Sequence, residues 1–280
     1  MLASRGAIIA ATDDDVIVPP EWVENLVRPF ARPDVMAVTG HVLPLELETA
    51  SQQAFEAYGG LGRGYDVREF TSGWFAWFKR QAVPTWELGA TANSAFRASV
   101  FADPRIGMFD EGLGAGTPAG VAEDTYLYYK ILKAGYTLAY EPSAWVSHRH
   151  RRDDGALRHQ LDAYSAGHVG YHLTTLFGDG DLRGLLHIVI GLPRGYIWRV
   201  RERAARRSTY PMSLLLTEVR GHLRGPWAMW QSRKRVRRLG HSSPTGTTTL
   251  PGLAAVSPSA TPAPDVRPAG AVRRTDASPG

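Results

Sequence analysis

The chain has 280 residues, of which 44% are hydrophobic, so it can bury a sizeable core as one large domain or two smaller ones. It contains no cysteine, which excludes disulfide bonds, thiolate zinc sites and cysteine nucleophiles, so any metal must bind to oxygen or nitrogen. The net charge is +5, and no apolar run approaches the ~20 residues of a membrane-spanning helix. We expect a cytoplasmic protein that is soluble or peripheral to the inner face of the plasma membrane.

The first elements are predicted to follow the order strand, helix, strand. Residues 7–12 (AIIAAT) form a short apolar run between a glycine and an acidic turn, which predicts a fully buried strand. The next segment begins with two prolines and places Trp22, Leu26 and Phe30 four residues apart, which predicts a helix. Residues 35–42 (VMAVTGHV) predict the next strand. This order is typical of an α/β domain.

A loop-rich middle follows these elements. Residues 122–133 then predict an amphipathic helix that Gly135 ends, and two short strands are predicted over residues 137–142 (TLAYEP) and 144–148 (AWVSH).

Composition divides the chain into three parts. The second part has a helical pattern that we expect to be interrupted at Pro193 and Pro211. The third part, at the C-terminal end, is rich in Pro, Ser, Thr, Ala and Gly and is predicted to be a disordered tail. The three predicted parts are an α/β domain over residues 1–153, a basic helical region over 154–240 and the tail over 241–280.

Three consecutive carboxylates, Asp13, Asp14 and Asp15, directly follow the first predicted strand. Ligands commonly meet an α/β protein at its strand ends, so Asp13 and Asp15 are well placed to hold a cation. Oxygen ligands that leave coordination positions open suit Mg²⁺ or Mn²⁺, which share their coordination with substrate phosphates. The same acids can instead cap the next helix or solvate a turn. A calcium loop is disfavoured, because no glycine or bidentate glutamate follows at the required spacing.

Two further groups of polar residues allow both a structural and a functional interpretation. Glu123 and Asp124 occupy the first turn of a predicted helix, where the helix dipole favours acids, but a carboxylate there can also act as a general base in a cleft.

The last predicted strand runs out into a cluster of histidine and arginine. Such a cluster is either a solvated basic edge or, beside a metal and a diphosphate, a source of an imidazole ligand and of phosphate contacts. Its members are His148, Arg149, His150, Arg151 and Arg152.

Four segments occur in order between residues 2 and 152: IIAATDDDV, WELGATANSAFR, FDEGLGAGTPAGVAEDTYLYYKILKAGY and YEPSAWVSHRH. Together they resemble the second half of the family 2 glycosyltransferases with the GT-A fold. The resemblance implies a GT-A-like (Rossmann-like) α/β fold, with a mixed sheet that lacks its first nucleotide-binding half, followed by C-terminal helices. It also implies an inverting, metal-dependent transfer of a sugar from a nucleotide-diphosphate donor to a hydroxyl of a cell-envelope polysaccharide or glycolipid.

The resemblance also implies roles for individual residues. Asp13, Asp15 and His148 are expected to bind Mn²⁺ or Mg²⁺, and Asp124 is expected to take the proton of the acceptor hydroxyl. Trp86 is expected to stack on a sugar face. The full set expected to contact the donor or the acceptor is Asp14, Trp86, Gly89, Asn93, Glu123, His150 and Arg151.

Members of this family begin with a βαβ half that holds the base and ribose of the nucleotide. Residues 1–6 (MLASRG) resemble the end of a helix that should precede the first predicted strand. We therefore expect N-terminal truncation, which would leave that strand without its usual neighbours.

Charge is concentrated late in the chain, because residues 181–240 carry fourteen Arg and Lys against three acidic residues. Arginine mixed with Trp and Tyr suits an anionic membrane surface or a lipid-linked acceptor, and a solvated helix face explains the composition equally well. No recognised nucleic-acid-binding motif accompanies it, so no nucleic-acid partner is expected.

The basic region keeps a second function open, that of a non-catalytic remnant that binds an anionic membrane surface through its basic helices. Nucleotide hydrolysis and nucleotidyl transfer are less favoured, because neither GGLGRGY nor GAGTPAG fits a glycine-rich phosphate loop.

Overall fold

The computed structural model describes residues 4–239, so the predicted disordered tail lies outside the described residues. The described chain is built on a mixed six-stranded sheet with the order β1-β5-β3-β6-β2, and β4 also pairs with β6. β3 and β6 are parallel, whereas the other pairs are antiparallel. The strands are β1 (Ile8–Thr12), β2 (Val16–Ile17), β3 (Val35–Pro44), β4 (Arg68–Phe70), β5 (Asn93–Arg97) and β6 (Thr137–His148).

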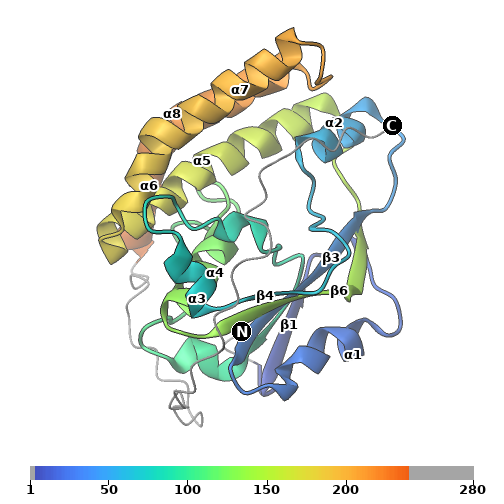
Figure 1. Cartoon of the computed structure of the whole chain (residues 1–280), viewed down its shortest axis with the longest axis vertical. Helices are drawn as coiled ribbons and strands as arrows, with labels where there is room; N and C mark the ends of the chain where they lie inside the picture. The colour runs from blue at the N-terminus through green and yellow to red at the C-terminus, as the bar shows by residue number, and fades with distance from the viewer. Residues whose placement is uncertain (1–3, 240–280) are drawn as a thin grey trace.

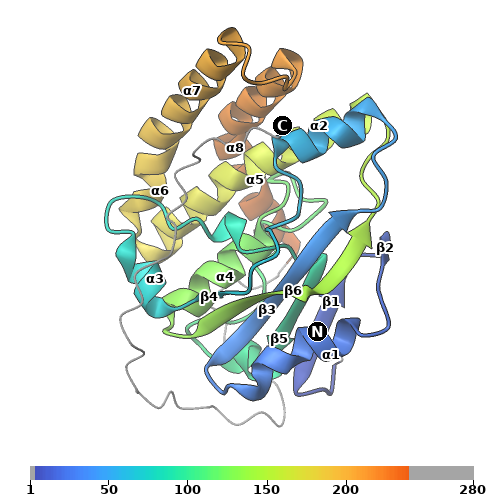
Figure 2. The same cartoon turned by 45° about the vertical axis from the view of Figure 1, so that its right-hand side comes forward.

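Helices cover both faces of this sheet, and a separate helical layer lies beside it (Figures 1 and 2). The helices are α1 (Trp22–Val27), α2 (Ala50–Tyr58), α3 (Ser72–Trp77), α4 (Glu123–Lys133), α5 (Asp154–Asp179), α6 (Leu182–Leu186), α7 (Leu192–Ala204) and α8 (Met212–Leu239). Short turns of 3₁₀ or π type are η1 (Arg28–Ala31), η2 (Thr85–Glu87), η3 (Ala98–Ala102) and η4 (His187–Gly191). The predicted α/β class, with a mixed GT-A-like sheet followed by C-terminal helices, is confirmed. No helix within residues 4–239 is both long and apolar enough to cross a membrane.

β3 presents apolar side chains to both faces of the sheet, so both faces are covered. Val35 and Val38 pack with Trp22, Leu26 and other apolar residues in one core cluster. Met36 and Ala37 pack instead with residues of α4, including Leu127 and Ile131, in a second cluster. The predicted four-residue spacing of Trp22, Leu26 and Phe30 is confirmed, because all three side chains are buried.

The first strand is less buried than its sequence predicts. Ala10 and Thr12 are exposed, and the other residues of β1 are half-buried. Within the described residues β1 pairs with β5 alone and lies at the edge of the sheet, so its second edge is uncovered. The prediction of a fully buried strand is therefore wrong.

The two short strands predicted over residues 137–148 are one continuous strand, β6. Its register against β3 shifts between the pairs Gly40–Glu141 and His41–Trp145. Pro142, which has no N–H for the ladder, lies in the bulged segment, so the strand bends there without ending.

The predicted interruption at Pro193 is also wrong. The helical run continues from α6 through the π turn η4 into α7, and Pro193 lies in the first turn of α7. Within a regular α-helix the ring of a proline clashes with the carbonyl of the residue four positions earlier. The wider π turn that precedes Pro193 gives this ring room. The true break lies at Gly180, which has the left-handed conformation that ends α5, whereas Pro211 precedes α8 as expected.

Asn93 joins three elements beneath the strand ends. Its side-chain amide donates to the carbonyls of His41 (2.9 Å) and Ala144 (2.6 Å), and its oxygen accepts from the indole N–H of Trp22 (2.8 Å). The side chain is fully buried. Because each partner would otherwise be an unsatisfied buried group, this residue fixes α1, β3 and the bulge of β6 relative to one another.

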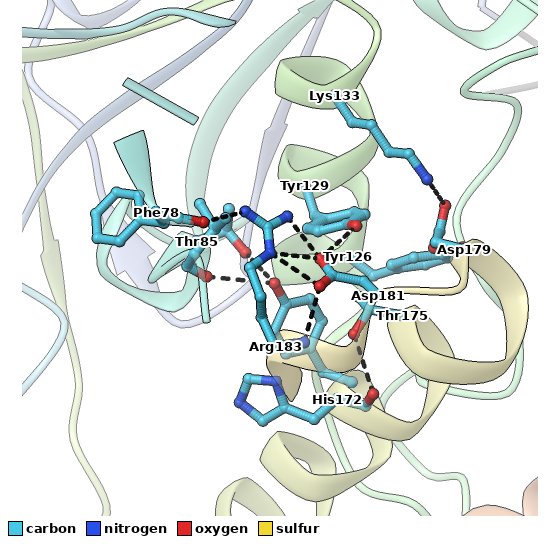
Figure 3. Close-up of polar contacts among 12 residues, drawn as sticks. Phe78, Thr85, Tyr126, Tyr129, Lys133, His172, Thr175, Asp179, Asp181 and Arg183 are labelled. Atoms are coloured by element: carbon cyan, nitrogen blue, oxygen red, sulfur yellow. Dashed lines mark hydrogen bonds and ion pairs between the residues drawn. The ribbon is translucent and has the colours of Figure 1, made fainter. Parts of the chain in front are cut away.

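Polar contacts attach α4 to the corner between α5 and α6 (Figure 3). Tyr129 donates its hydroxyl to Asp181 at 2.8 Å, and Lys133 pairs with Asp179 at 2.8 Å. Asp181 caps α6 through the backbone N–H of Arg183 and also pairs with its guanidinium, which donates to the carbonyl of Phe78. The corner that begins α6 is therefore held from both sides.

Candidate functional site

A cleft of about 1720 Å³ lies between the ends of the central strands and the helical layer. Nine of the eleven residues predicted to form the site line this cleft, although they come from opposite halves of the described chain. They are Asp13, Asp14, Asp15, Trp86, Gly89, Glu123, Asp124, His148 and Arg151. Asn93 and His150 are not among the lining residues.

Strand pairing brings the three predicted metal ligands together. Val16 in β2 pairs with His148 at the end of β6, and the backbone N–H of Arg149 donates to the carbonyl of Asp15 at 3.1 Å. The Nε2 atom of His148 then lies 3.2 Å from Asp15 Oδ1 and 3.8 Å from Asp13 Oδ2. One ligand atom from each residue falls within 4.8 Å of the others.

A chain of contacts behind His148 sets which of its nitrogens carries the proton. The Glu56 carboxylate can only accept, so His150 Nε2 donates to it at 2.8 Å and leaves His150 Nδ1 as an acceptor. His148 Nδ1 lies 3.2 Å from that atom and donates to it. Neutral His148 therefore presents a bare Nε2 lone pair to the two aspartates.

With His148 neutral, the electrostatics of the trio favour a cation. Burial lowers the pKa of His148, against the opposing charge of Asp15. Burial also raises the pKa of Asp13, which the nearby His148 opposes and the charge of Asp15 reinforces. A bare imidazole nitrogen that faces two carboxylates is repulsive until a positive charge lies between them. One nitrogen and two carboxylate oxygens are a donor set that fits Mn²⁺, and the oxygens also suit Mg²⁺.

Asp124 lies at the start of α4 with its carboxylate held by backbone N–H groups. Thr125 donates to Oδ1 at 2.6 Å and Thr91 donates to Oδ2 at 3.3 Å. Burial raises the pKa of Asp124 in spite of these bonds. The carboxylate is therefore fixed in position on the cleft wall and has an increased affinity for a proton.

Glu123 forms a second carboxylate beside Asp124. Burial, followed by the charge of Asp124, raises the pKa of Glu123 to about 7. Its Oε2 accepts from the backbone N–H of Ala122 at 3.0 Å. Two adjacent carboxyls in one cleft titrate as a pair, so the first proton is bound near neutral pH.

Arg63 is a cleft residue that the sequence did not single out. Its guanidinium donates to the carbonyls of Gly62 (2.7 Å) and Trp86 (3.3 Å). Burial lowers its pKa, and the negative charges of Glu87 and Asp124 oppose that effect. The segment GGLGRGY does not fit a phosphate loop, but its arginine places a positive charge near the carboxylates of Glu87 and Asp124.

Trp86 and Gly89 are positioned by the segment before β5. Trp86 lies in η2 and lines the cleft, as a sugar-stacking residue requires. Gly89 has a φ of 126°, and a Cβ there would lie 2.5 Å from the Cβ of Thr39. Glycine is therefore required at this position for the backbone to pass so close to β3.

Two predicted ligand-binding residues are placed differently by the structure. Asn93 is expected to contact the donor or the acceptor. Its amide is instead fully buried and forms hydrogen bonds with Trp22, His41 and Ala144. His150 is likewise buried and lies behind His148. Neither side chain lines the cleft of this structure: His150 supports His148, which does, and Asn93 connects α1, β3 and β6. Contact of these two residues with a ligand stays a prediction.

Comparison with curated proteins finds similarity to two glycosyltransferases. The pre-mycofactocin glycosyltransferase of Mycobacterium tuberculosis is 28% identical over 147 residues, which cover 51% of this chain and 27% of that protein. The O-antigen chain rhamnosyltransferase RfbN of Salmonella typhimurium is 30% identical over 143 residues, which cover 51% of this chain and 41% of that protein. The chain therefore covers less than half of each relative. No family model matches the chain.

The acidic pair predicts a pH-dependent stability. A carboxyl whose pKa is higher in the folded state than in the unfolded chain stabilises the fold at low pH, and this contribution is lost as pH rises through the folded-state pKa. For Glu123 the loss should occur between about pH 4.5 and pH 7. Between pH 4.5 and 8 the free energy of unfolding should therefore fall further in the wild type than in Glu123→Gln, by about 1–3 kcal/mol.

Denaturant titration at each pH measures this difference. Glu24→Gln, which changes an exposed glutamate of α1, is the matched control and should follow the wild type. Parallel pH profiles for the wild type and Glu123→Gln would show that the folded state does not perturb this carboxyl.

Proposed function

We propose that this protein is an inverting, metal-dependent glycosyltransferase that moves a sugar from a nucleotide-diphosphate donor to a hydroxyl of a cell-envelope polysaccharide or glycolipid. The observation that carries the proposal is that two separate clusters of carboxylate residues line one cleft. One is the Asp13, Asp15 and His148 trio, and the other contains Asp124. The partial similarity to two curated glycosyltransferases supports sugar transfer in general.

The trio at the strand ends would hold Mn²⁺ or Mg²⁺ through the carboxylates of Asp13 and Asp15 and the Nε2 of His148. When bound, the cation neutralises negative charge that accumulates on the departing diphosphate. His150 and Glu56 keep the proton of His148 on Nδ1, so the nitrogen that faces the aspartates stays free to bind.

Asp124 is the general base in this proposal. The acceptor oxygen forms a bond to the anomeric carbon, the bond from that carbon to the diphosphate breaks, and Asp124 accepts the proton that the hydroxyl loses. A single displacement of this kind inverts the configuration at the carbon. The N–H groups of Thr91 and Thr125 fix the carboxylate before the acceptor arrives.

Other residues of the cleft suit the remainder of the two substrates. Arg151 is exposed at the cleft, where a guanidinium can contact the diphosphate. Trp86 offers an aromatic face to a sugar, and Asp14 and Glu123 offer carboxylates to sugar hydroxyls.

Replacement of Asp124 tests the proposal. Asp124→Asn keeps the shape of the side chain but cannot accept the proton, so the transfer rate should fall by ~10²-fold or more while donor affinity barely changes. The assay mixes the native protein with Mn²⁺, a panel of nucleotide sugars and a membrane-derived acceptor. It measures the nucleoside diphosphate that the transfer reaction produces.

Asp66→Asn changes an exposed loop residue that does not line the cleft, so this control should turn over normally. Near-wild-type turnover in Asp124→Asn would remove the assignment of the base. Lost donor affinity without a rate effect would instead place Asp124 in the donor site.

A second candidate function, attachment to an anionic membrane surface, is favoured by the exposed side chains of the C-terminal helices. Large apolar side chains are exposed on each of these helices. Those exposed on α6, η4, α7 and α8 include Leu182, Leu186, Val189, Ile190, Ile197, Val200, Leu216, Leu223, Trp227 and Trp230. Exposed arginines lie on the same helices, among them Arg194, Arg201, Arg220, Arg237 and Arg238.

This combination suits the headgroup region of an anionic membrane, where apolar and aromatic side chains insert and arginines contact the lipid charge. A protein that works on a lipid-linked acceptor at the inner face of the plasma membrane would use such a surface. The same surface would serve a non-catalytic remnant, which the Asp124→Asn assay separates from the enzyme.

Vesicle binding tests the surface. Leu223→Ser combined with Trp227→Ser removes two side chains that are 79% and 59% exposed, so binding to vesicles with anionic lipid should weaken at least ~10-fold. High salt should also weaken the wild type, because charges are screened within ~8 Å at physiological ionic strength.

The control is Val67→Ser, which removes an exposed apolar side chain far along the chain from these helices. Equal vesicle binding by the double variant and the wild type would leave these helices as a solvated face.

A further inference from the structure

Three histidines form a second cluster in the wall of the cleft. His168 and His172 lie one turn apart on α5, and His187 comes from the π turn η4. The Nε2 of His168 lies 3.0 Å from the Nε2 of His187 and 3.3 Å from that of His172. One nitrogen from each ring falls within 4.8 Å of the others.

Hydrogen bonding alone does not satisfy this arrangement. An imidazole nitrogen carries either one N–H or one in-plane lone pair, so it makes one good hydrogen bond in the ring plane. The Nε2 of His168 has two ring nitrogens at hydrogen-bond distance. At most one of these two contacts can therefore be a well-aligned hydrogen bond, and the other holds two ring nitrogens close together without one.

Protonation does not relieve the conflict either. Burial lowers the pKa of His168 and His172 well below the usual value, and the neighbouring histidines lower it further. Burial also lowers the pKa of His187. Asp181 acts on His172 with the opposite sign, but that carboxylate already pairs with Arg183 (Figure 3). The rings are therefore neutral, and neutral imidazole is the form that binds metals.

The elements that carry the three rings are fixed independently. Figure 3 shows Asp181 and Arg183 holding the start of α6, one turn before His187. The ring of His172 points away from Asp179 in this view, and its backbone carbonyl accepts from Thr175.

The indole of Trp86 packs against all three histidines. The distances between ring centroids are 4.7 Å to His168, 5.4 Å to His172 and 5.3 Å to His187. The hydroxyl of Thr85, the residue before this tryptophan, bonds to that of Tyr171 at 2.9 Å. One wall of the cluster is thus the residue proposed to stack on a sugar.

We propose that His168, His172 and His187 form a three-nitrogen site for Zn²⁺ in the wall of the cleft. Tetrahedral coordination with bonds of 2.0–2.1 Å places ligand nitrogens about 3.3 Å apart, which matches the separations around His168. Three protein nitrogens leave a fourth position for water or for an oxygen of a cleft ligand. His168 and His187 line the cleft, so that position is accessible from it.

The proposed site differs in chemistry from the trio of Asp13, Asp15 and His148. It offers nitrogen alone, which suits Zn²⁺ or Co²⁺ and not Mg²⁺, whereas the trio offers mainly oxygen. His222 lies beside His168 but is not one of the three histidines whose ligand nitrogens lie within 4.8 Å of one another. One site would hold the Mn²⁺ or Mg²⁺ of the reaction, and the other would fix α5, η4 and the Trp86 wall.

Metal titration of the whole protein, freed of metal by a chelator, tests the proposal. Zn²⁺ competition against a chromophoric chelator should detect a site that a large excess of Mg²⁺ does not occupy. His168→Gln and His187→Gln should each weaken Zn²⁺ binding there by more than about 100-fold, beyond the 10–100-fold cost of losing an outer-shell partner. With Co²⁺, the wild type should show the visible absorption of a tetrahedral ion, and both variants should lose it.

Two controls separate this site from the rest of the cleft. His159→Gln changes an exposed histidine of the same helix, and Asp15→Asn changes the other cluster. Both should retain the Zn²⁺ affinity and the Co²⁺ absorption. Unchanged Zn²⁺ affinity in His168→Gln and His187→Gln would overturn the proposal, as would the absence of tetrahedral Co²⁺ absorption from the wild type.

Discussion

The antiparallel pairing of β2 with the end of β6 is the interaction on which the candidate site depends. It sets Val16 opposite His148, so carboxylates near the start of the chain meet an imidazole from its middle. The parallel pairing of β6 with β3 and the buried amide of Asn93 fix β6 in turn. A change in the register of β6 would therefore move the imidazole of His148 away from the two carboxylates, even if the amino-acid sequence stayed the same.

Burial of charge gives the cleft its chemical character. The same cause, loss of solvation, raises the pKa of Asp13, Glu123 and Asp124 and lowers that of His148. Positive charge offsets the repulsion among these carboxylates. Arg63 supplies one such charge, and the proposed metal would supply another. The nitrogen-only donor set around His168 suits a different metal. In our proposal that metal would fix the wall of the cleft, while the metal beside Asp13 and Asp15 would act on the phosphates.

Local patterns in the sequence were sufficient for α1, β3 and α4, because each is set by the periodicity and terminal residues of one short segment. The burial of β1 and the continuity of β6 depend on which strands become neighbours, which no local pattern encodes. Asn93 and His150 are similar cases, because their partners are distant in sequence. The i, i+4 pair in GHVGYH was a visible signal for His168 and His172, but His187 joins them only through the turn between α6 and α7.

The most direct test of the account is whether a histidine nitrogen binds the cation beside Asp13 and Asp15. Pulsed electron paramagnetic resonance of protein-bound Mn²⁺ detects such a nitrogen through its magnetic coupling to the metal. The account predicts this coupling in the wild type and in His168→Gln, and its loss together with weaker Mn²⁺ binding in His148→Gln. Unchanged coupling and affinity in His148→Gln would contradict it.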